Sequence, residues 1–176
     1  MNRLNFVQLY AENEDNCAAF EQLMWQYAKE LDRHQGRATP DDVTAKWIQS
    51  IIQIQGDSDR HLELCYNDKT LIGFLYGKID RPEHRGFIKA GYGYIMEFFV
   101  LPEFRRKGYG KEMYLRLKTL FMKDGAKQIY LTSDPVTGKP FWESLGFVNT
   151  GERSPENGLE IYEKQLSKSM MEKLSM

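Results

Sequence analysis

Three basic residues stand directly before two glycines in the stretch VLPEFRRKGYG, residues 100–110. Residues 105–107 read Arg-Arg-Lys, and Gly108 and Gly110 follow where a helical pattern begins. The first turn of a helix has unpaired backbone N–H groups and the positive end of the helix dipole, so it favours an anion and disfavours added positive charge. A bound anion would remove that conflict. The stretch therefore indicates a local anion site.

Two common phosphate-binding motifs do not fit this stretch. A P-loop needs Ser or Thr after its lysine, whereas Glu112 follows Lys111, and a dinucleotide-binding motif needs a third glycine where Met113 stands. What remains is a turn in which the N–H groups of residues 105–110 can point into one concavity, because glycine lets the backbone approach a ligand closely. A solvated basic turn is the alternative interpretation.

The longer segment YIMEFFVLPEFRRKGYGKEMYLRLK resembles the acetyl-CoA-binding core of the GNAT superfamily of N-acetyltransferases. That family carries [QR]-x-x-G-x-[GA] after a strand ending in Val-x-Pro-x-[FY]-[RQ], and its x-x-F-Y-x-x-x-G-F helix is similar to KPFWESLGF, residues 139–147. The resemblance covers residues 90–150 in detail. The matching residues are Val100, Pro102, Phe104, Arg105, Gly108, Gly110, Phe141, Gly146 and Phe147.

The resemblance implies that the cofactor is acetyl-CoA. The amides of residues 105–110 would hold its pyrophosphate, with the basic side chains toward the phosphates. Backbone groups of Phe98 and Val100 would pair with the pantetheine arm, which would enter where the parallel strands 92–101 and 127–133 splay apart. The residues expected to bind the cofactor are Phe98, Val100, Arg105, Arg106, Lys107, Gly108, Tyr109, Gly110 and Trp142.

Glu97 is the first candidate for the general base. The resemblance implies direct attack of an amine on the thioester, and the amine must lose a proton. Strand alternation puts Glu97 on the same side as Ile95 and Phe99, where partial desolvation would raise the carboxyl pKa toward a useful value. Two alternatives stay open: Glu97 anchors a cationic substrate, or it is a sheet-surface carboxylate paired with Arg or Lys.

Trp142 departs from the family, which usually has at this position a tyrosine that protonates the departing thiolate. An indole N–H donates hydrogen bonds but has no accessible acidity. Either the thiolate leaves without a proton donor, or Tyr94, Tyr130 or Ser133 takes that role, or the enzyme is slow.

The leading hypothesis is an acetyl-CoA-dependent N-acetyltransferase that acetylates a primary amine of a small molecule or protein. The alternative is a non-catalytic or regulatory acetyl-CoA-binding module. With 24 Lys plus Arg, 25 Asp plus Glu and a net charge of −1, neither nucleic-acid nor membrane binding is expected. In this family the acceptor is usually chosen by two segments, here residues 32–39 and 152–158, and their mixed charge favours neither sign of substrate.

Location, metal binding and assembly follow from simpler features. The N-terminus has no apolar run long enough for a signal peptide or a membrane span. The two cysteines and three histidines show no close metal-ligand spacing, so no metal is expected, and the cysteines are interpreted as core residues in a reducing compartment. A cytoplasmic location is therefore expected, and a homodimer is left open.

A mixed α/β fold of the GNAT type is expected to position these side chains. The pattern predicts the order βααβββαβαββ, with a mostly antiparallel central sheet, one splayed parallel strand pair and about four flanking helices. Thr39 is expected to cap the second helix, and Val43, Trp47, Ile51 and Ile54 to form its apolar face. The chain is predicted to be a single domain over residues 1–176, with a polar tail at residues 166–176.

Overall fold

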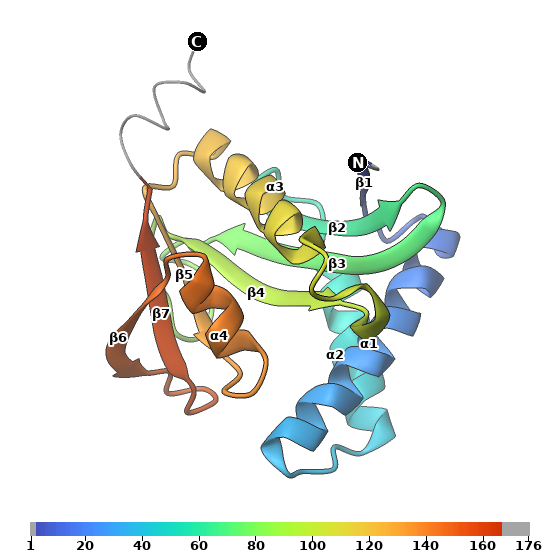
Figure 1. Cartoon of the computed structure of the whole chain (residues 1–176), viewed down its shortest axis with the longest axis horizontal. Helices are drawn as coiled ribbons and strands as arrows, with labels where there is room; N and C mark the ends of the chain where they lie inside the picture. The colour runs from blue at the N-terminus through green and yellow to red at the C-terminus, as the bar shows by residue number, and fades with distance from the viewer. Residues whose placement is uncertain (1–2, 167–176) are drawn as a thin grey trace. The chain divides into compact units, whose positions relative to one another are not determined.

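The computed structural model describes residues 3–166, and its helices and strands follow the predicted order (Figure 1). The strands are β1 Leu4–Gln8, β2 Arg60–Asn67, β3 Thr70–Ile79, β4 Gly93–Val100, β5 Gln128–Ser133, β6 Val148–Arg153 and β7 Glu160–Gln165. The helices are α1 Glu14–Gln35, α2 Asp41–Gln53, α3 Tyr109–Lys123 and α4 Gly138–Ser144, with a short 3-10 turn, η1, at Pro102–Phe104. The expected polar tail lies outside the described residues from residue 167 onward.

The seven strands form one sheet in the order β1-β2-β3-β4-β5-β7-β6. β4 and β5 are parallel, whereas β1–β2, β5–β7 and β6–β7 are antiparallel. The recorded β4–β5 ladder pairs Gly93 with Ile129 and Tyr94 with Tyr130. The predicted mixed α/β class, with a mostly antiparallel sheet, one parallel pair and four helices, is confirmed.

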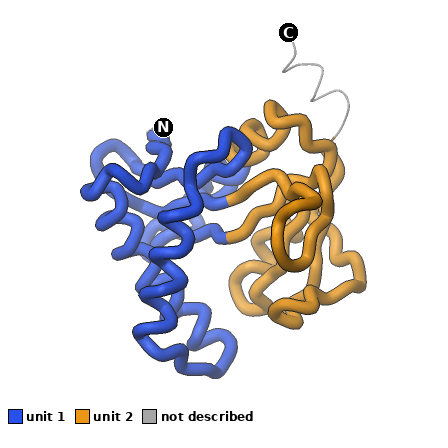
Figure 2. The backbone as a smooth tube through the Cα atoms, turned by 180° about the vertical axis from the view of Figure 1, so that it is seen from behind, with its two compact units in different colours: residues 1–76, 97–114 blue, residues 77–96, 115–176 orange. Residues whose placement is uncertain are grey.

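The backbone divides into two compact units, which Figure 2 colours separately. The first unit contains residues 1–76 and 97–114, and the second contains residues 77–96 and 115–176. β3, β4 and α3 each contribute residues to both units. The prediction of a single domain over residues 1–176 stays a prediction.

In the first unit, α1 is defined by a cap at each end and by a buried stripe. The Asn13 side chain accepts a hydrogen bond from the backbone of the first turn, and Gly36 ends the helix with φ 61°. Phe20 packs edge-on against Phe74 of β3, with 5.1 Å between ring centroids. The buried residues of α1 are Phe20, Leu23, Met24, Ala28 and Glu30. The helix therefore keeps a fixed rotation about its axis, which sets where its polar residues Tyr27 and Glu30 lie.

The predicted cap of α2 is wrong, and its predicted apolar face is only partly right, because Ile51 is buried and Trp47 half-buried as expected. Pro40 occupies the cap position without a side-chain hydrogen bond, and Thr39 instead donates through its amide and hydroxyl to Asp32. Val43 and Ile54 are exposed. The buried residues of α2 are Thr44, Ile48, Ile51 and Ile52. Apolar residues occur on more than one side of this helix, so packing, not hydrophobicity alone, selects the buried face.

In the second unit, two glycines let α3 lie close to the sheet. A Cβ atom added at Gly77 of β3 or at Gly93 of β4 would approach the Phe121 ring to 2.5 Å, below any normal contact distance. Phe121 itself is fully buried. Because no larger residue fits beneath this ring, the two glycines fix the depth at which α3 packs.

A buried carboxylate organises the connector at residues 81–91, which joins β3 to β4 in the second unit. Asp80 is 1% exposed and accepts hydrogen bonds from the Tyr130 hydroxyl and from the Lys89 amide at 3.0 Å. The Lys78 ammonium lies 3.5 Å from its other oxygen. Asp80 therefore ties the connector to β5 as well as to its own strand.

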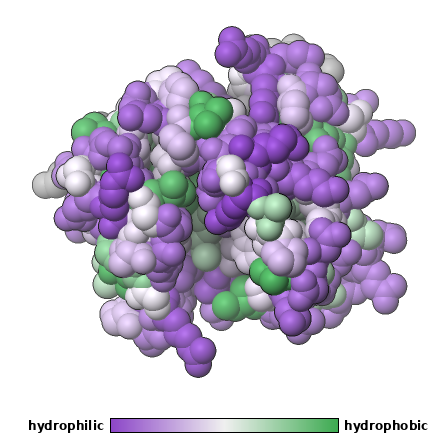
Figure 3. Space-filling view, turned by 90° about the horizontal axis from the view of Figure 1, so that it is seen from below, coloured by the Kyte–Doolittle hydropathy of each residue, from purple (hydrophilic) through white to green (hydrophobic). Residues whose placement is uncertain are grey.

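Polar side chains cover most of the face shown in Figure 3, and apolar side chains gather in small areas of it. None of the helices between residues 3 and 166 has the length and apolar character needed to cross a membrane.

We predict that Asp80→Ala lowers the free energy of unfolding by about 3 kcal/mol, because it leaves buried donors of Tyr130 and Lys89 without an acceptor. Urea denaturation measures this change. The matched control is Asp57→Ala, which removes an exposed carboxylate and should change stability by less than about 0.5 kcal/mol. Equal effects of the two substitutions would contradict the structural role of Asp80.

Candidate active site

Glu97 lies on the side of β4 that faces α1. Ile95 and Phe99 are buried, and Glu97, between them, keeps partial exposure. Tyr27 of α1 contacts two of these residues: its hydroxyl donates to the Glu97 carboxylate, and its ring lies 5.4 Å from the Phe99 ring. The alternation predicted for this strand therefore places the Glu97 side chain against a helix and not among surface cations.

Desolvation changes the proton affinity of Glu97. Burial raises the pKa of this carboxyl from 4.5 to about 7, although the hydrogen bond from Tyr27 acts in the opposite direction. A group with a pKa near the operating pH is present in both protonation states, which is the property of an efficient general base. Glu97 can therefore accept a proton and release it again at neutral pH.

Arg105 is held by groups of the first unit. One guanidinium nitrogen, Nη2, donates to both carboxylate oxygens of Glu30 at 2.9 Å, and Nε donates to the Val100 carbonyl at 2.8 Å. The guanidinium also lies over the Phe99 ring, 5.5 Å from its centroid. The predicted contact of this side chain with cofactor phosphates stays a prediction.

The turn at residues 105–110 has the backbone conformation of an anion-binding concavity. Arg106 and Gly108 both have left-handed backbone, with φ 61° and 86°. Left-handed residues within a turn direct successive N–H groups to one side. Glu112 donates to the Gly108 carbonyl at 3.2 Å, so α3 begins here, and its first N–H groups have no acceptor within the helix. A Cβ at Gly108 would meet nothing within 4 Å. Glycine is therefore needed at this position for its left-handed backbone and not because a side chain would collide.

The other predicted cofactor residues of the first unit differ in what their side chains contact. Arg106 and Lys107 are exposed, and the Lys107 ammonium lies 5.8 Å from the centroid of the Phe104 ring. Phe98 is half-buried on the strand face opposite Glu97.

The first two residues of α3 complete the predicted set. The Tyr109 hydroxyl accepts from Asn67 at 2.9 Å, and Gly110 lies in the first turn of α3. Tyr109 and Gly110 can therefore contribute backbone N–H groups to the turn.

Trp142 belongs to the second unit, where it is a packing residue. Its side chain is 6% exposed, and its ring lies 4.7 Å from the Phe141 ring and 5.4 Å from the Phe147 ring. The helix that carries it is anchored by Asp134, whose carboxylate accepts from the Gly138 amide at 2.8 Å and from Thr137. The substitution of tryptophan for the expected tyrosine thus fills an aromatic cluster.

Two of the residues considered as substitute proton donors are already engaged. Tyr130 donates to Asp80 and stacks on Tyr94 at 4.5 Å. Burial, together with that carboxylate, raises the pKa of Tyr130 above its ordinary value. The Ser133 hydroxyl donates to the Asp134 carbonyl at 3.1 Å. Proton donation from Tyr130 is therefore disfavoured.

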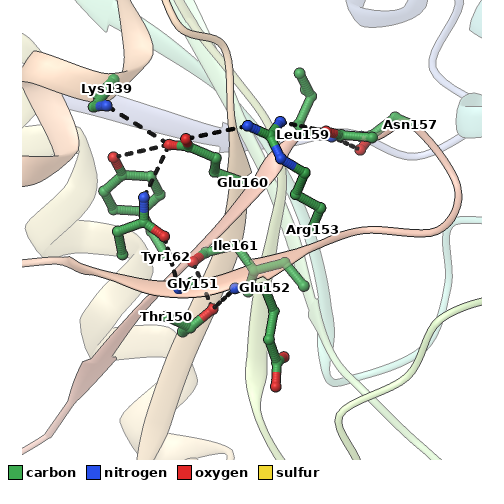
Figure 4. A network of polar contacts seen from close by, with 12 residues as sticks. Lys139, Thr150, Gly151, Glu152, Arg153, Asn157, Leu159, Glu160, Ile161 and Tyr162 are labelled. Carbon is green, nitrogen blue, oxygen red and sulfur yellow. Dashed lines mark hydrogen bonds and ion pairs between the residues drawn. The ribbon is translucent and has the colours of Figure 1, made fainter.

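Both segments expected to choose the acceptor are organised by their own polar groups. At residues 32–39, Asp32 accepts from Arg37 and from Thr39, and these hydrogen bonds, led by the one from the Thr39 amide, lower the pKa of Asp32. At residues 152–158, Arg153 donates to the Gly158 carbonyl at 2.9 Å. Its guanidinium also lies 3.5 Å from the Glu160 carboxylate. Figure 4 shows this ion pair within a network of polar contacts. These hydrogen bonds favour a defined conformation in each segment.

Sequence reasoning missed Tyr27 and Glu30 as site residues. Both lie on α1, one turn apart, and in the sequence Tyr27 shows only the helical spacing of an apolar stripe with Phe20, Leu23, Met24 and Leu31. For Glu30 the sequence offers one signal, a glutamate beside an apolar stripe. A carboxylate is rarely fully buried without a partner, so this position indicates a charged partner on another element. Among residues 3–166, no group of three His, Cys, Asp or Glu side chains is placed to hold a metal ion.

Comparison with known families tests the predicted family. The model of the acetyltransferase (GNAT) family matches residues 9–147. The chain belongs to the GNAT acetyltransferase family. The predicted family is thereby confirmed, and so, at the level of the family, is acetyl-CoA as the cofactor.

Solved GNAT structures share the fold at low sequence identity. The PaiA N-acetyltransferase from Thermoplasma acidophilum, crystallised with coenzyme A, is 19% identical with a TM-score of 0.65, over 93% of this chain and 99% of that one. A GNAT acetyltransferase from Staphylococcus aureus Mu50 is 14% identical with a TM-score of 0.69, over 94% and 100% of the two chains. AAC(6')-Iy, in complex with the bisubstrate analogue CoA-S-monomethyl-acetylneamine, is 21% identical with a TM-score of 0.60, over 86% of this chain and 94% of that one. No curated protein sequence matches this GNAT chain.

We predict that the stability of this GNAT protein depends on pH through Glu97. Folding raises the pKa of this carboxyl to about 7, so unfolding releases a proton between about pH 4.5 and pH 7, and stability falls as the pH rises through that window. Glu97→Gln removes the titration. The melting temperature of the variant minus that of the wild type should therefore increase from pH 5 to pH 8.

The control for this pH dependence is Glu103→Gln, which removes an exposed carboxylate of η1. Its difference from the wild type should stay constant over the same range. A constant difference for Glu97→Gln as well would show that Glu97 titrates as an ordinary glutamate.

Proposed function

We propose that this GNAT protein is an acetyl-CoA-dependent N-acetyltransferase that transfers the acetyl group directly to a primary amine, with Glu97 as the general base. The observation that carries the proposal is the desolvated Glu97 carboxyl, with a pKa of about 7, on the strand that leads into the turn at residues 105–110. The acceptor is an amine of a small molecule or of a protein.

The cofactor is bound mainly by backbone groups. Amides of residues 106–110 receive the pyrophosphate, and Arg106 and Lys107, both exposed, add positive charge beside it. Phe98 and Val100 offer their backbone to the pantetheine arm. The Val100 carbonyl accepts from Arg105 and has a second lone pair for the cofactor. The coenzyme A complex of the archaeal PaiA enzyme, which shares the fold, supports this assignment.

Glu97 supplies the proton transfer that the amine needs. An alkylammonium has a pKa near 10, so at neutral pH the acceptor arrives protonated and cannot attack. Glu97 takes that proton and passes it to solvent, and the amine nitrogen forms a bond to the thioester carbon. The carbon–sulfur bond breaks as the coenzyme A thiolate leaves, and the nitrogen loses its second proton to solvent. The Tyr27 hydroxyl stabilises the ionised carboxylate by hydrogen bonding, which keeps its pKa from rising further.

A non-catalytic acetyl-CoA-binding module is the second candidate, and the observation that favours it is Trp142. This residue is buried in an aromatic cluster, and Tyr130 is committed to Asp80. Neither arrangement supplies an acid for the leaving thiolate. The two candidates differ in turnover, which the amine assay below measures. The cytoplasmic location stays a prediction, and the homodimer stays open.

The first prediction tests the cofactor turn. Coenzyme A should raise the melting temperature of the wild type, because a ligand that binds only the folded state stabilises it. Gly108→Asp should abolish that shift, since a carboxylate would lie against the phosphates. Gly108→Asn is the matched control, because asparagine has the same shape, tolerates left-handed backbone and is neutral. A full shift in Gly108→Asp would remove the pyrophosphate from this turn.

The second prediction tests the base. A panel of primary amines is assayed with acetyl-CoA, and Glu97→Gln should lower turnover of the best acceptor by roughly 10²-fold at neutral pH. Coenzyme A binding should be unchanged. If the variant loses only apparent affinity for the amine, Glu97 is a substrate anchor. If the wild type binds acetyl-CoA and turns over none of the amines, the binding-module alternative holds.

A further inference from the structure

Helix α1 makes two polar links to the segment that contains β4 and the cofactor turn. Tyr27 donates to Glu97, and one turn further along the helix Glu30 binds Arg105 through both carboxylate oxygens at 2.9 Å. All four residues belong to the first unit. The links therefore join one face of α1 to the candidate base and to the first residue of the turn.

We propose that Glu30 is a positioning residue for the cofactor: acting through Arg105, it holds the turn at residues 105–110 in the conformation that receives the pyrophosphate. Arg105 is thereby a structural anchor and not a phosphate ligand. The inference rests on the proposed function, because it assigns the part of the protein that keeps the cofactor turn in shape.

The first reason is that the Arg105 guanidinium is surrounded by fixed partners. Glu30 is 8% exposed, and a carboxylate at that depth needs a charged partner. Arg105 meets this need with a two-oxygen contact while its Nε donates to the Val100 carbonyl and its plane lies over Phe99. Charge-assisted contacts of this kind are the strongest and most directional that side chains make. Turning Arg105 toward a phosphate would break all of them and leave Glu30 unpaired.

The second reason is the backbone that follows. Arg106 has φ 61°, a conformation that residues other than glycine rarely adopt and that persists only when the surrounding structure holds it. Its preceding residue, Arg105, is fixed on one side by Glu30 and on the other by its own amide, which donates to the Pro102 carbonyl at 3.2 Å. The Glu30 contact thus restrains the turn directly before the residue that redirects its N–H groups.

The experiment measures the Kd for coenzyme A by calorimetry and the acetyl-CoA KM and kcat with the best amine. Glu30→Gln keeps the shape of the side chain and removes the charge, and it should weaken coenzyme A binding by about tenfold, the loss expected for one charge-assisted contact. The KM should rise in parallel, and kcat should change less than twofold. The control is Glu103→Gln, an exposed glutamate of the same segment, which should leave the Kd unchanged.

The direction in which the Kd for coenzyme A changes separates this proposal from the alternative that Arg105 binds the phosphates. If Arg105 is itself the phosphate ligand, removing Glu30 frees it, and coenzyme A binds more tightly to Glu30→Gln; a lower or unchanged Kd overturns the proposal. If Glu30 acts through Arg105, the double variant with Arg105→Lys should bind no more weakly than the weaker single variant. Additive losses would overturn it as well.

Three further outcomes are distinguishable. A lower melting temperature with an unchanged Kd would give Glu30 a merely structural role and overturn the proposal. Should circular dichroism show that Glu30→Gln does not fold, Glu30→Asp, which keeps the charge but has a shorter reach, is measured with the same expectations. A wild type that binds no coenzyme A would refute the proposed function itself, whatever the variants do.

Discussion

In the first unit, the chemistry available to the site depends on how far the Glu97 carboxyl is removed from water. A glutamate in water is fully ionised at neutral pH and is a weak base, so its usefulness depends on the groups that surround it. Here the surroundings are aromatic: the Tyr27 ring lies 5.8 Å from Phe74 and 5.4 Å from Phe99, which in turn lie 6.1 Å apart. These rings come from α1, β3 and β4, so Glu97 acquires its pKa only when all three elements pack together.

The same packing prepares the turn that follows. Phe99 contributes to the aromatic cluster through its ring, and the Arg105 guanidinium covers that ring. A turn rich in N–H donors and cations is unfavourable without an anion, because like charges and unpaired donors meet there. The first unit therefore contains two features on one chain segment. The Glu97 carboxyl has a pKa raised by burial, and the turn that follows it favours a bound anion. The two requirements are served by neighbouring residues of a single strand–turn–helix segment.

Local patterns in the sequence were sufficient to predict the elements and to place Glu97 on a strand that packs against a helix. The order of helices and strands, the strand that carries Glu97, and the basic turn all follow from periodicity and from motifs confined to short segments. What local patterns could not give was the choice among equivalent local arrangements. In α2, Val43 and Thr44 are neighbours, and only the packing of the helix decides that Thr44 is buried and Val43 exposed. Thr39 could cap that helix, yet it bonds to Asp32, seven residues earlier.

The partners of the site residues were equally beyond local patterns. Tyr27 and Glu97 are 70 residues apart in the chain, and Glu30 and Arg105 are 75 apart. Each residue of such a pair looks ordinary within its own element. On α1, for example, Tyr27 has the spacing of an apolar position, and Glu30 is a charged residue beside the apolar stripe. Their functions appear only when a second element brings the complementary group into contact, and no spacing within one element encodes this.

The replacement of tyrosine by Trp142 is compatible with catalysis when the leaving group is considered. An ordinary thiol has a pKa near 8.5, so a thiolate is only slightly basic at neutral pH, whereas an alkoxide or an amide anion is strongly basic. Departure of coenzyme A as the thiolate thus needs little help from a proton donor. Loss of a proton from an ammonium with a pKa near 10 is the harder requirement, and in the mechanism that we propose this step falls to Glu97. A GNAT protein can therefore give the tyrosine position to packing, as the contacts of Trp142 with Phe141 and Phe147 indicate, provided that it keeps the base.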